Sequence, residues 1–290
     1  MTIKSHRPLG NTGQHVTGIG LGGMPLSLQG RPDEKEALQV ITTFVECGGN
    51  FIDTANVYCL DDSDIGHNER LINKALEKLG YPDDIIVATK GGLTRPKGRW
   101  EVDASPGWLR QSCARSLQDL NTECIFLYQL HAPDPDVPLS ESVGELVRLR
   151  EEGKLLHIGL SNVNVHEIET ALLITPIVSV QNRCNVFEKK SFNNGVTSLC
   201  REKGITFIAH SPAGGHNTHG KTMDNSLLKK LASRYDASPY QIALAWLLHK
   251  GEHILPIPGA SRTSSITDSL KSLDVTLEEV DLEQLDQLSG

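Results

Sequence analysis

The sequence predicts an α/β fold of the (β/α)8, or TIM, barrel class, and two observations support this prediction. Short, almost continuous apolar runs alternate with longer segments whose apolar residues recur at helical spacing. Strands that are apolar on both faces are typical of a parallel sheet covered by helices, and eight such runs follow one another within 290 residues. Because no linker or shift in composition divides the chain, we expect a single barrel domain over residues 1–290 that includes a short N-terminal β-hairpin.

The first three predicted strands and the helices between them show this alternation. Apolar side chains recur every three or four positions in residues 33–47, which predicts a helix with one buried face, and the glycine pair at 48–49 ends it. The same spacing recurs in residues 66–79. The strands around these two helices are predicted at residues 17–21, 50–53 and 85–89.

The same unit of helix and strand repeats through the rest of the chain. Further helices are predicted at residues 106–120, 140–152, 165–173, 191–203, 226–235, 239–249, 263–270 and 282–288. Further strands are predicted at residues 124–130, 155–160, 177–180, 205–209 and 254–257. A glycine-rich loop at 212–220 interrupts the alternation. In such barrels the chemistry takes place at the C-terminal ends of the strands, so the residues that follow each strand are the candidates for a site.

Composition and charge narrow the classes of partner. The formal net charge is −8, which argues against nucleic acid or an anionic membrane as a partner, and any anionic ligand then requires a local basic patch. No apolar run has the length of a membrane helix, and the N-terminus has no apolar core of a secretory signal, so a cytoplasmic protein is expected. The six cysteines are scattered singly, which indicates reduced thiols. No metal site is expected, because the loop around His216 and His219 offers no third ligand.

One glycine motif suggests a different fold and has to be weighed. Residues 18–23 match Gly-x-Gly-x-x-Gly, the fingerprint of a dinucleotide-binding Rossmann domain. That fingerprint has meaning only where a helix begins inside it and can hold a pyrophosphate at its N-terminus. Residues 24–30, Met-Pro-Leu-Ser-Leu-Gln-Gly, do not form such a helix. The motif therefore does not favour a Rossmann domain here.

Four polar side chains follow three successive predicted strands. Asp53 ends the strand at 50–53 and Tyr58 follows it, while Lys90 and His131 follow the next two strands. A tyrosine is a poor acid at neutral pH, but a nearby ammonium stabilises its phenolate and lowers its pKa. Lys90 can act in this way on Tyr58 if Asp53 holds it by an ion pair, and His131 can donate a hydrogen bond to a carbonyl oxygen. The set suits protonation of an oxygen while a carbonyl carbon receives a hydride.

Together with the sequence around them, these residues resemble the aldo-keto reductase family along almost the whole chain. The resemblance implies a reductase of aldehydes and ketones that uses a nicotinamide cofactor, with Tyr58 as general acid and base, Asp53 and Lys90 as the pair that tunes it, and His131 orienting the substrate carbonyl. The stretches that carry it are Phe51-Ile52-Asp53-Thr54-Ala55 with Tyr58, Ala88-Thr89-Lys90, Tyr128-Gln129-Leu130-His131, Gly153-Lys154-Leu155-Leu156-His157-Ile158-Gly159-Leu160-Ser161-Asn162 and Ile257-Pro258-Gly259.

The resemblance also implies where the nicotinamide end of the cofactor binds. Ser161, Asn162 and Gln181 match the positions that hold the nicotinamide carboxamide, and Ser211 with the loop after it matches the segment along the pyrophosphate. His210 occupies the position at which family members commonly stack an aromatic ring on the nicotinamide. An imidazole can stack as well, but more weakly.

The opposite end of the cofactor is expected near the last strand. Residues 259–268 match the segment that binds the adenosine and its 2′-phosphate in this family, with Gly259, Ser261 and Arg262 as the implied contacts. Arg262 supplies the local positive charge that an acidic protein needs there. We therefore expect NADP (NADPH) rather than NAD, although Gly259 stands where a lysine is often found.

Several functional alternatives remain at this point. A regulatory protein of the potassium-channel β-subunit type keeps the fold and the nucleotide but has little turnover, and a barrel aldolase would use Lys90 as a Schiff-base nucleophile. A short-chain dehydrogenase is excluded, because none of the five tyrosines has a lysine four residues later. The physiological substrate and the oligomeric state stay open.

Two further residues bear on the substrate side of the expected pocket. Loops at 24–28, 95–102 and 216–222 are expected to contact the substrate. Trp100 is either a wall of the pocket or a surface-loop residue that covers the barrel. Cys59 follows Tyr58 where glycine is frequent in the family. It is either a thiol beside the pocket or an apolar packing residue.

Overall fold

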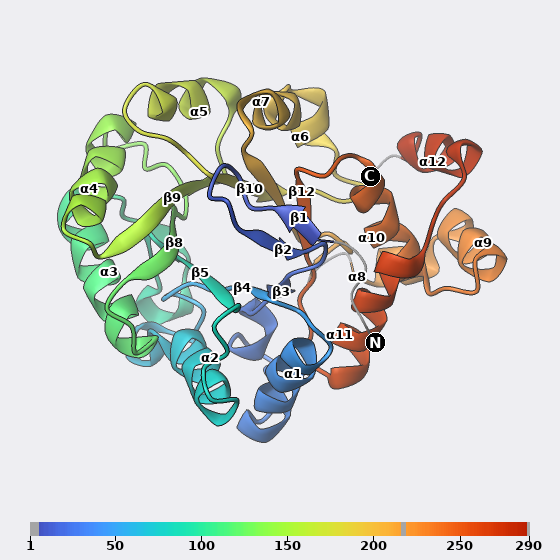
Figure 1. Cartoon of the computed structure of the whole chain (residues 1–290), viewed down its shortest axis with the longest axis horizontal. Helices are drawn as coiled ribbons and strands as arrows, with labels where there is room; N and C mark the ends of the chain where they lie inside the picture. The colour runs from blue at the N-terminus through green and yellow to red at the C-terminus, as the bar shows by residue number, and fades with distance from the viewer. Residues whose placement is uncertain (1–5, 216–218, 289–290) are drawn as a thin grey trace.

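The barrel is formed by one parallel sheet. The computed structural model describes residues 6–215 and 219–288, and in this part of the chain eight strands lie in the order β12-β11-β10-β9-β8-β5-β4-β3 (Figure 1). The strands are β3 (Leu21–Gly22), β4 (Phe51–Asp53), β5 (Ile86–Gly91), β8 (Ile125–Leu130), β9 (Leu155–Ser161), β10 (Ser179–Arg183), β11 (Thr206–His210) and β12 (Ile254–Ile257).

Contacts between the first and last strands bring the sheet close to full closure. The N–H of Gly20 donates to the carbonyl of Pro256, and the N–H of Gly22 donates to the carbonyl of Pro258, both at 3.0 Å. A Cβ at position 22 would lie 2.8 Å from the carbonyl oxygen of Ile257, so only glycine allows this approach. The predicted (β/α)8 barrel is confirmed.

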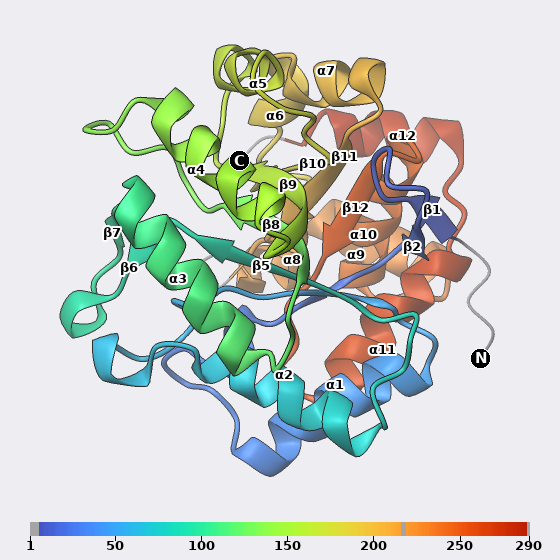
Figure 2. The same cartoon turned by 60° about the vertical axis from the view of Figure 1, so that its left-hand side comes forward.

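Helices surround the barrel, as Figures 1 and 2 show. Most lie within two residues of their predicted positions. Their bounds are α1 (Glu34–Glu46), α2 (His67–Lys78), α3 (Pro106–Asp119), α4 (Leu139–Glu151), α5 (Val165–Leu172), α6 (Lys190–Asn193), α7 (Val196–Lys203), α8 (His219–Asp224), α9 (Ser226–Arg234), α10 (Pro239–His249), α11 (Thr263–Lys271) and α12 (Glu279–Asp286).

The N-terminal hairpin is confirmed and lies at one end of the barrel. Strand β1 (His6–Pro8) pairs antiparallel with β2 (His15–Thr17). Leu9 and Val16 in this hairpin join the apolar cluster inside the barrel, which includes Phe51. The first barrel strand therefore begins later than predicted, at Leu21 instead of residue 17, because Thr17 belongs to the hairpin.

Three further segments differ from the prediction in the number or kind of their elements. The single helix predicted at 191–203 is two helices, α6 and α7, because Gly195 has a φ of +87° and interrupts the helical backbone. Helix α8 lies partly within the predicted loop at 212–220. A second hairpin, β6 (Leu93–Thr94) with β7 (Glu101–Val102), follows β5 and lies far from the N-terminal hairpin in Figure 2.

The part of the chain that the structure describes contains neither a membrane-spanning helix nor a metal-binding cluster. None of the helices that the structure describes is long and apolar enough to cross a membrane. Within residues 6–215 and 219–288, no three histidine, cysteine or acidic side chains gather in a way that could hold a metal ion. His216 lies outside the described residues, as does the side chain of His219.

Candidate active site

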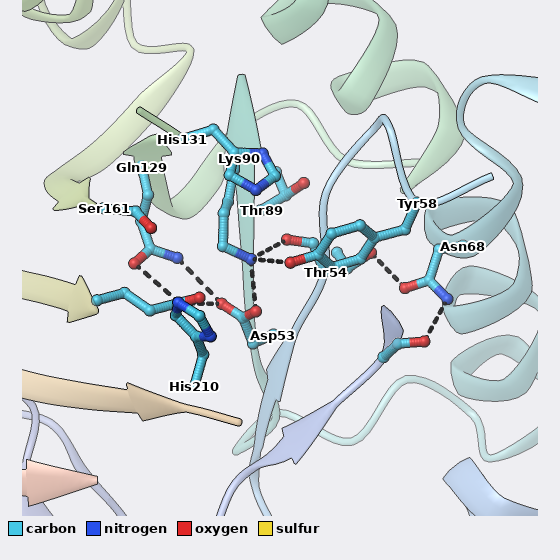
Figure 3. A network of polar contacts seen from close by, with 12 residues as sticks. Asp53, Thr54, Tyr58, Asn68, Thr89, Lys90, Gln129, His131, Ser161 and His210 are labelled. Carbon is cyan, nitrogen blue, oxygen red and sulfur yellow. Dashed lines mark hydrogen bonds and ion pairs between the residues drawn. The ribbon is translucent and has the colours of Figure 1, made fainter. Parts of the chain in front are cut away.

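The inward side chains of the barrel change from apolar to polar toward the C-terminal ends of the strands. In β4 the inward residue Phe51 is followed two positions later by Asp53, and in β5 Ala88 is followed by Lys90. This follows from the two-residue period of a strand, which keeps alternate residues on one face. Figure 3 shows the resulting polar layer, in which Asp53, Lys90, Gln129 and Ser161 come from successive strands of the sheet.

Lys90 is the centre of this layer. Its side chain has no exposed surface, and its Nζ donates to Oδ1 of Asp53 at 2.5 Å, to the carbonyl of Thr54 at 2.9 Å and to the hydroxyl of Tyr58 at 3.0 Å. An ammonium group has three N–H donors, so these bonds use all of them. Because the hydroxyl oxygen of Tyr58 accepts from Lys90, its own proton points away from the ammonium.

Asp53 is the counter-ion of Lys90 and also accepts from two glutamines. Its Oδ2 accepts from Nε2 of Gln181 at 2.7 Å and from Nε2 of Gln129 at 3.1 Å. A buried ion pair is favourable only when further hydrogen bonds satisfy its remaining lone pairs, and these two amides do so. Gln181, predicted as a cofactor contact, is thus buried and bonded to Asp53. Gln129 is a further residue of this layer, which the sequence does not predict.

Burial and the neighbouring charges act on Tyr58 in opposite directions. Burial raises the pKa of its phenol and Asp53 raises it further, while the ammonium of Lys90 lowers it, and the net pKa lies above the usual value. The sequence predicts a net lowering of this pKa by Lys90, and that prediction is wrong. Loss of solvent around the phenol outweighs the ammonium, because the phenolate loses its hydration on burial. Tyr58 therefore carries its proton at neutral pH.

His131 lies beside Tyr58 as a neutral imidazole. Its ring centroid is 5.8 Å from that of Tyr58, and the two planes meet at 81°. Burial, and then the charge of Lys90, lower the pKa of His131 well below its usual value. The Nδ1 atom is buried without a hydrogen-bond partner among the described residues. A neutral imidazole carries one N–H, which can donate to a carbonyl oxygen.

Trp100 and Cys59 lie close to Tyr58 but differ in their surroundings. The indole of Trp100 is 6.4 Å from the Tyr58 ring and 6.5 Å from the His131 ring, and the guanidinium of Arg95 stacks on it at 4.0 Å. Trp100 therefore forms a wall beside the two rings. Cys59 is fully buried, its Sγ contacts the carbonyl of Val57, and burial raises the pKa of its thiol to about 11. Its position indicates a packing residue.

The residues predicted to hold the nicotinamide carboxamide lie next to His131. Ser161 ends β9 and is almost fully buried, while Asn162 is exposed with a φ of +58°. Nδ2 of Asn162 donates to the carbonyl of His131 at 2.9 Å and lies 3.1 Å from Oγ of Ser161. The structure thus brings Ser161 and Asn162 to the same mouth as His131.

His210 and Ser211 continue the mouth on β11. Nδ1 of His210 lies 3.2 Å from Oγ of Ser211. Burial, followed by the charges of Lys90 and Arg183, lowers the pKa of His210 to about 3, so its ring is neutral. Ser211 has a φ of +52°, and its carbonyl accepts from Nδ2 of Asn185 at 3.1 Å. The chain therefore turns sharply at Ser211, next to the polar layer.

The predicted phosphate contacts follow β12 and are separate from this hydrogen-bond network. Gly259 and Arg262 are exposed, and Ser261 is half-buried. Arg262 is the N-cap residue of α11 and makes no side-chain capping bond. The first N–H groups of a helix favour anions, so this end of α11 offers both amide donors and a guanidinium.

Comparisons with known proteins give one consistent result. The model described as the aldo/keto reductase family matches residues 18–289. A probable aldo-keto reductase of Glycine max is 34% identical over 306 aligned positions, which cover 96% of this chain and 86% of the relative.

Solved structures agree with this match. The holo form of an aldo-keto reductase from Bacillus halodurans superposes with a TM-score of 0.82 at 26% identity and covers 99% of this chain and 96% of its own. An aldo-keto reductase from Klebsiella pneumoniae in complex with NADPH gives a TM-score of 0.82 at 22% identity, covering 99% and 95% of the two chains. At that identity the second likeness concerns the fold alone.

Proposed function

This chain belongs to the aldo/keto reductase family, and from that premise we propose that it is an NADPH-dependent oxidoreductase of aldehydes and ketones. The reaction is a reversible hydride transfer in which Tyr58 is the general acid and base. The observation that carries the proposal is the arrangement around Lys90, whose ammonium donates to the Tyr58 hydroxyl while Asp53 neutralises its charge.

In this proposal the substrate carbonyl oxygen lies between Tyr58 and His131. NADPH, when bound, supplies the hydride that the carbonyl carbon receives. Tyr58 gives its proton to the oxygen as negative charge develops there, and Lys90 stabilises the phenolate that remains. The neutral imidazole of His131 donates a hydrogen bond to the same oxygen. Trp100 bounds the space on one side and excludes water from it.

The residues around the mouth fit a nicotinamide cofactor. A carboxamide needs both donors and acceptors, and the hydroxyl of Ser161 and the amide of Asn162 supply them next to His131. The proposed contact of Gln181 with the carboxamide is through its oxygen, because its Nε2 donates to Asp53. We assign His210 to the face of the nicotinamide ring, and Ser211 to the pyrophosphate.

The preference for NADPH over NADH is proposed on the basis of Arg262. Its exposed guanidinium at the start of α11 can contact a 2′-phosphate as a planar fork. Arg262→Ala is expected to weaken NADPH binding about tenfold and to leave NADH binding unchanged, since such contacts contribute roughly 1–3 kcal/mol. Fluorescence titration gives both dissociation constants. Lys271→Ala, at the other end of the same helix, is the control; an unchanged NADPH preference in Arg262→Ala would remove this role.

A steady-state assay of NADPH oxidation against a panel of aldehydes and ketones tests the function itself. Tyr58→Phe is expected to lower kcat about 1,000-fold, within the range for loss of a general acid. The exposed Tyr81, changed to phenylalanine, serves as the control. If Tyr58→Phe retains most of the activity, Tyr58 is not the proton donor. Tight NADPH binding without turnover of any carbonyl would instead favour a regulatory, nucleotide-binding role.

A further inference from the structure

The position of the Lys90 ammonium depends on a backbone carbonyl outside the four proposed catalytic side chains. Of its three acceptors, the carbonyl of Thr54 belongs to the residue that follows β4, where the chain leaves the sheet. A strand end is held less firmly than the strand itself, so this carbonyl needs support from elsewhere. We propose that Asn68, the second residue of α2, is a positioning residue that fixes Thr54 and through it the Lys90 ammonium. This proposal rests on the function proposed above.

Thr54 is held by two bonds in addition to the one from Lys90. Its N–H donates to the carbonyl of Ala88 in β5 at 2.8 Å, and its hydroxyl donates to Oδ1 of Asn68 at 2.6 Å. Both Thr54 and Asn68 are fully buried. Figure 3 shows Thr54 between Lys90 on one side and Asn68 on the other. The side chain of Thr54 thus connects the peptide that Lys90 contacts to helix α2.

The amide of Asn68 can take only one orientation. Its Nδ2 donates to the carbonyl of Gly23 at 2.8 Å and lies 2.7 Å from Oγ of Ser27. A carbonyl oxygen is only an acceptor, so the amino group must face Gly23 and the amide oxygen must face Thr54. An aspartate at position 68 would place a carboxylate oxygen against the Gly23 carbonyl. The contact therefore requires an amide and not merely a side chain of this size.

Gly23 extends the support to the other residue that holds Lys90. Its N–H donates to the carbonyl of Asp53 at 2.8 Å. A Cβ at position 23 would lie 2.4 Å from Oδ1 of Asn68 and 3.1 Å from the Asp53 carbonyl, so the three groups are in close contact. Asn68 therefore supports the chain at both Asp53 and Thr54. Oxygens of these two residues, together with the Tyr58 hydroxyl, accept the hydrogen bonds of the Lys90 ammonium.

Loss of this support is expected to change proton transfer and not cofactor binding. Without Asn68 the Thr54 carbonyl can turn away, and the ammonium of Lys90 is then drawn toward the Asp53 carboxylate, its charged acceptor, and stabilises the Tyr58 phenolate less. The pKa of Tyr58 should rise and its proton transfer should slow. Small displacements of catalytic groups lower rates by factors on the order of ten to a hundred.

The test compares Asn68→Ala and Thr54→Val with wild type in the NADPH-dependent reductase assay. Both variants should lower kcat about tenfold and move the alkaline limb of the kcat–pH profile to higher pH, with NADPH dissociation constants within about twofold of wild type. The double variant should be no worse than the more impaired single one, because both changes break the same link. Asn73→Ala, on the same helix but bonded to the exposed Tyr81, is the matched control and should behave as wild type.

These measurements distinguish a positioning role of Asn68 from a contribution to folding only. A lower kcat without a shift of the pH profile, or additive losses in the double variant, would overturn the positioning role and leave a contribution to folding only. If Asn68→Ala does not fold, Thr54→Val carries the test, because valine keeps the shape of threonine and removes only the hydroxyl. A wild-type protein without turnover would overturn the proposed function and this inference together, whereas an active wild type with unaffected variants would overturn the inference alone.

Discussion

Two buried carboxylates lie on opposite faces of strand β5, and their surroundings differ. Asp53 faces the barrel interior, where it pairs with Lys90 and accepts hydrogen bonds from two glutamine amides. Glu69 lies on the helix side with no exposed surface, and its Oε1 accepts one bond, from the Thr89 hydroxyl at 2.6 Å. Its Oε2 has no hydrogen-bond partner in the part of the chain that the structure describes.

The difference shows that partners, and not burial alone, decide the charge of a buried acid. Burial raises the pKa of Glu69 to about 7, and the Thr89 hydroxyl, which lowers it, does not compensate. Asp119 raises this pKa further, and Arg70 lowers it only weakly. The strand thus separates a charged pair, which we propose tunes Tyr58, from an acid that is half protonated near neutral pH. Thr89 and Lys90 are neighbours in this strand, and their side chains point to opposite faces. Thr89 faces the helix side and Lys90 faces the barrel interior.

The largest expected effect comes from breaking the charged pair. Asp53→Ala leaves the ammonium of Lys90 buried without a counter-ion, which should lower the free energy of unfolding by roughly 3–5 kcal/mol. Urea unfolding at pH 7, followed by circular dichroism, measures this loss. Loss of less than about 1 kcal/mol would mean that water or other groups already compensate the charge of Lys90.

Glu69→Gln should have a smaller effect, which depends on pH. The pKa of Glu69 is raised in the folded protein relative to its ordinary value of 4.5, so folding favours the protonated form. The stability that this raised pKa contributes is fully present below pH 4.5. It is lost as the pH rises toward 7, and the stability does not change further with pH above 7. Between pH 5 and pH 8 the wild type should lose roughly 2–3 kcal/mol of stability that the glutamine variant keeps.

Unfolding curves of the two proteins at several pH values measure this linkage. The variant should equal the wild type at pH 5 and exceed it at pH 8, the opposite sign to Asp53→Ala. Parallel pH dependences of the two proteins would show that Glu69 does not titrate in this range. Glu36→Gln, at an exposed position of α1, controls for loss of one negative charge.

The sequence predicted the polar residues at the strand ends much better than those inside a strand or on the helix side of the sheet. Asp53, Lys90 and His131 could be found because each follows an apolar run at a strand end. Gln129 lies inside its strand, and which way it points is known only once the register with β5 is known. Glu69 appears in the sequence as an ordinary charged helix residue, although it lies three positions before the buried Ile72, on the apolar side of α2.

Longer-range features needed the fold as well. Asn68 reaches Gly23 and Thr54, 45 and 14 residues away, and no local pattern encodes such contacts. The net direction of the Tyr58 pKa also depends on burial, which cannot be read from the neighbouring charges that the sequence supplies. By contrast, the helix and strand periods determined the barrel, because eight repeated units allow few other arrangements.

The smallest expected effect concerns the single bond that Glu69 does receive. Thr89→Val keeps the shape of the side chain and removes the hydroxyl, so Oε1 loses its donor. The expected cost is about 1 kcal/mol at pH 5, where the acid is neutral, and somewhat more at pH 8, where a charged acceptor is left without the bond. Because Thr89 lowers the pKa of Glu69, the variant should also titrate at higher pH than wild type. Unfolding curves at both pH values measure both changes. Thr94→Val, in the hairpin formed by β6 and β7, is the control. An equal cost at the two values would mean that Glu69 keeps the same protonation state throughout, and the contrast with Asp53 would then rest on geometry alone.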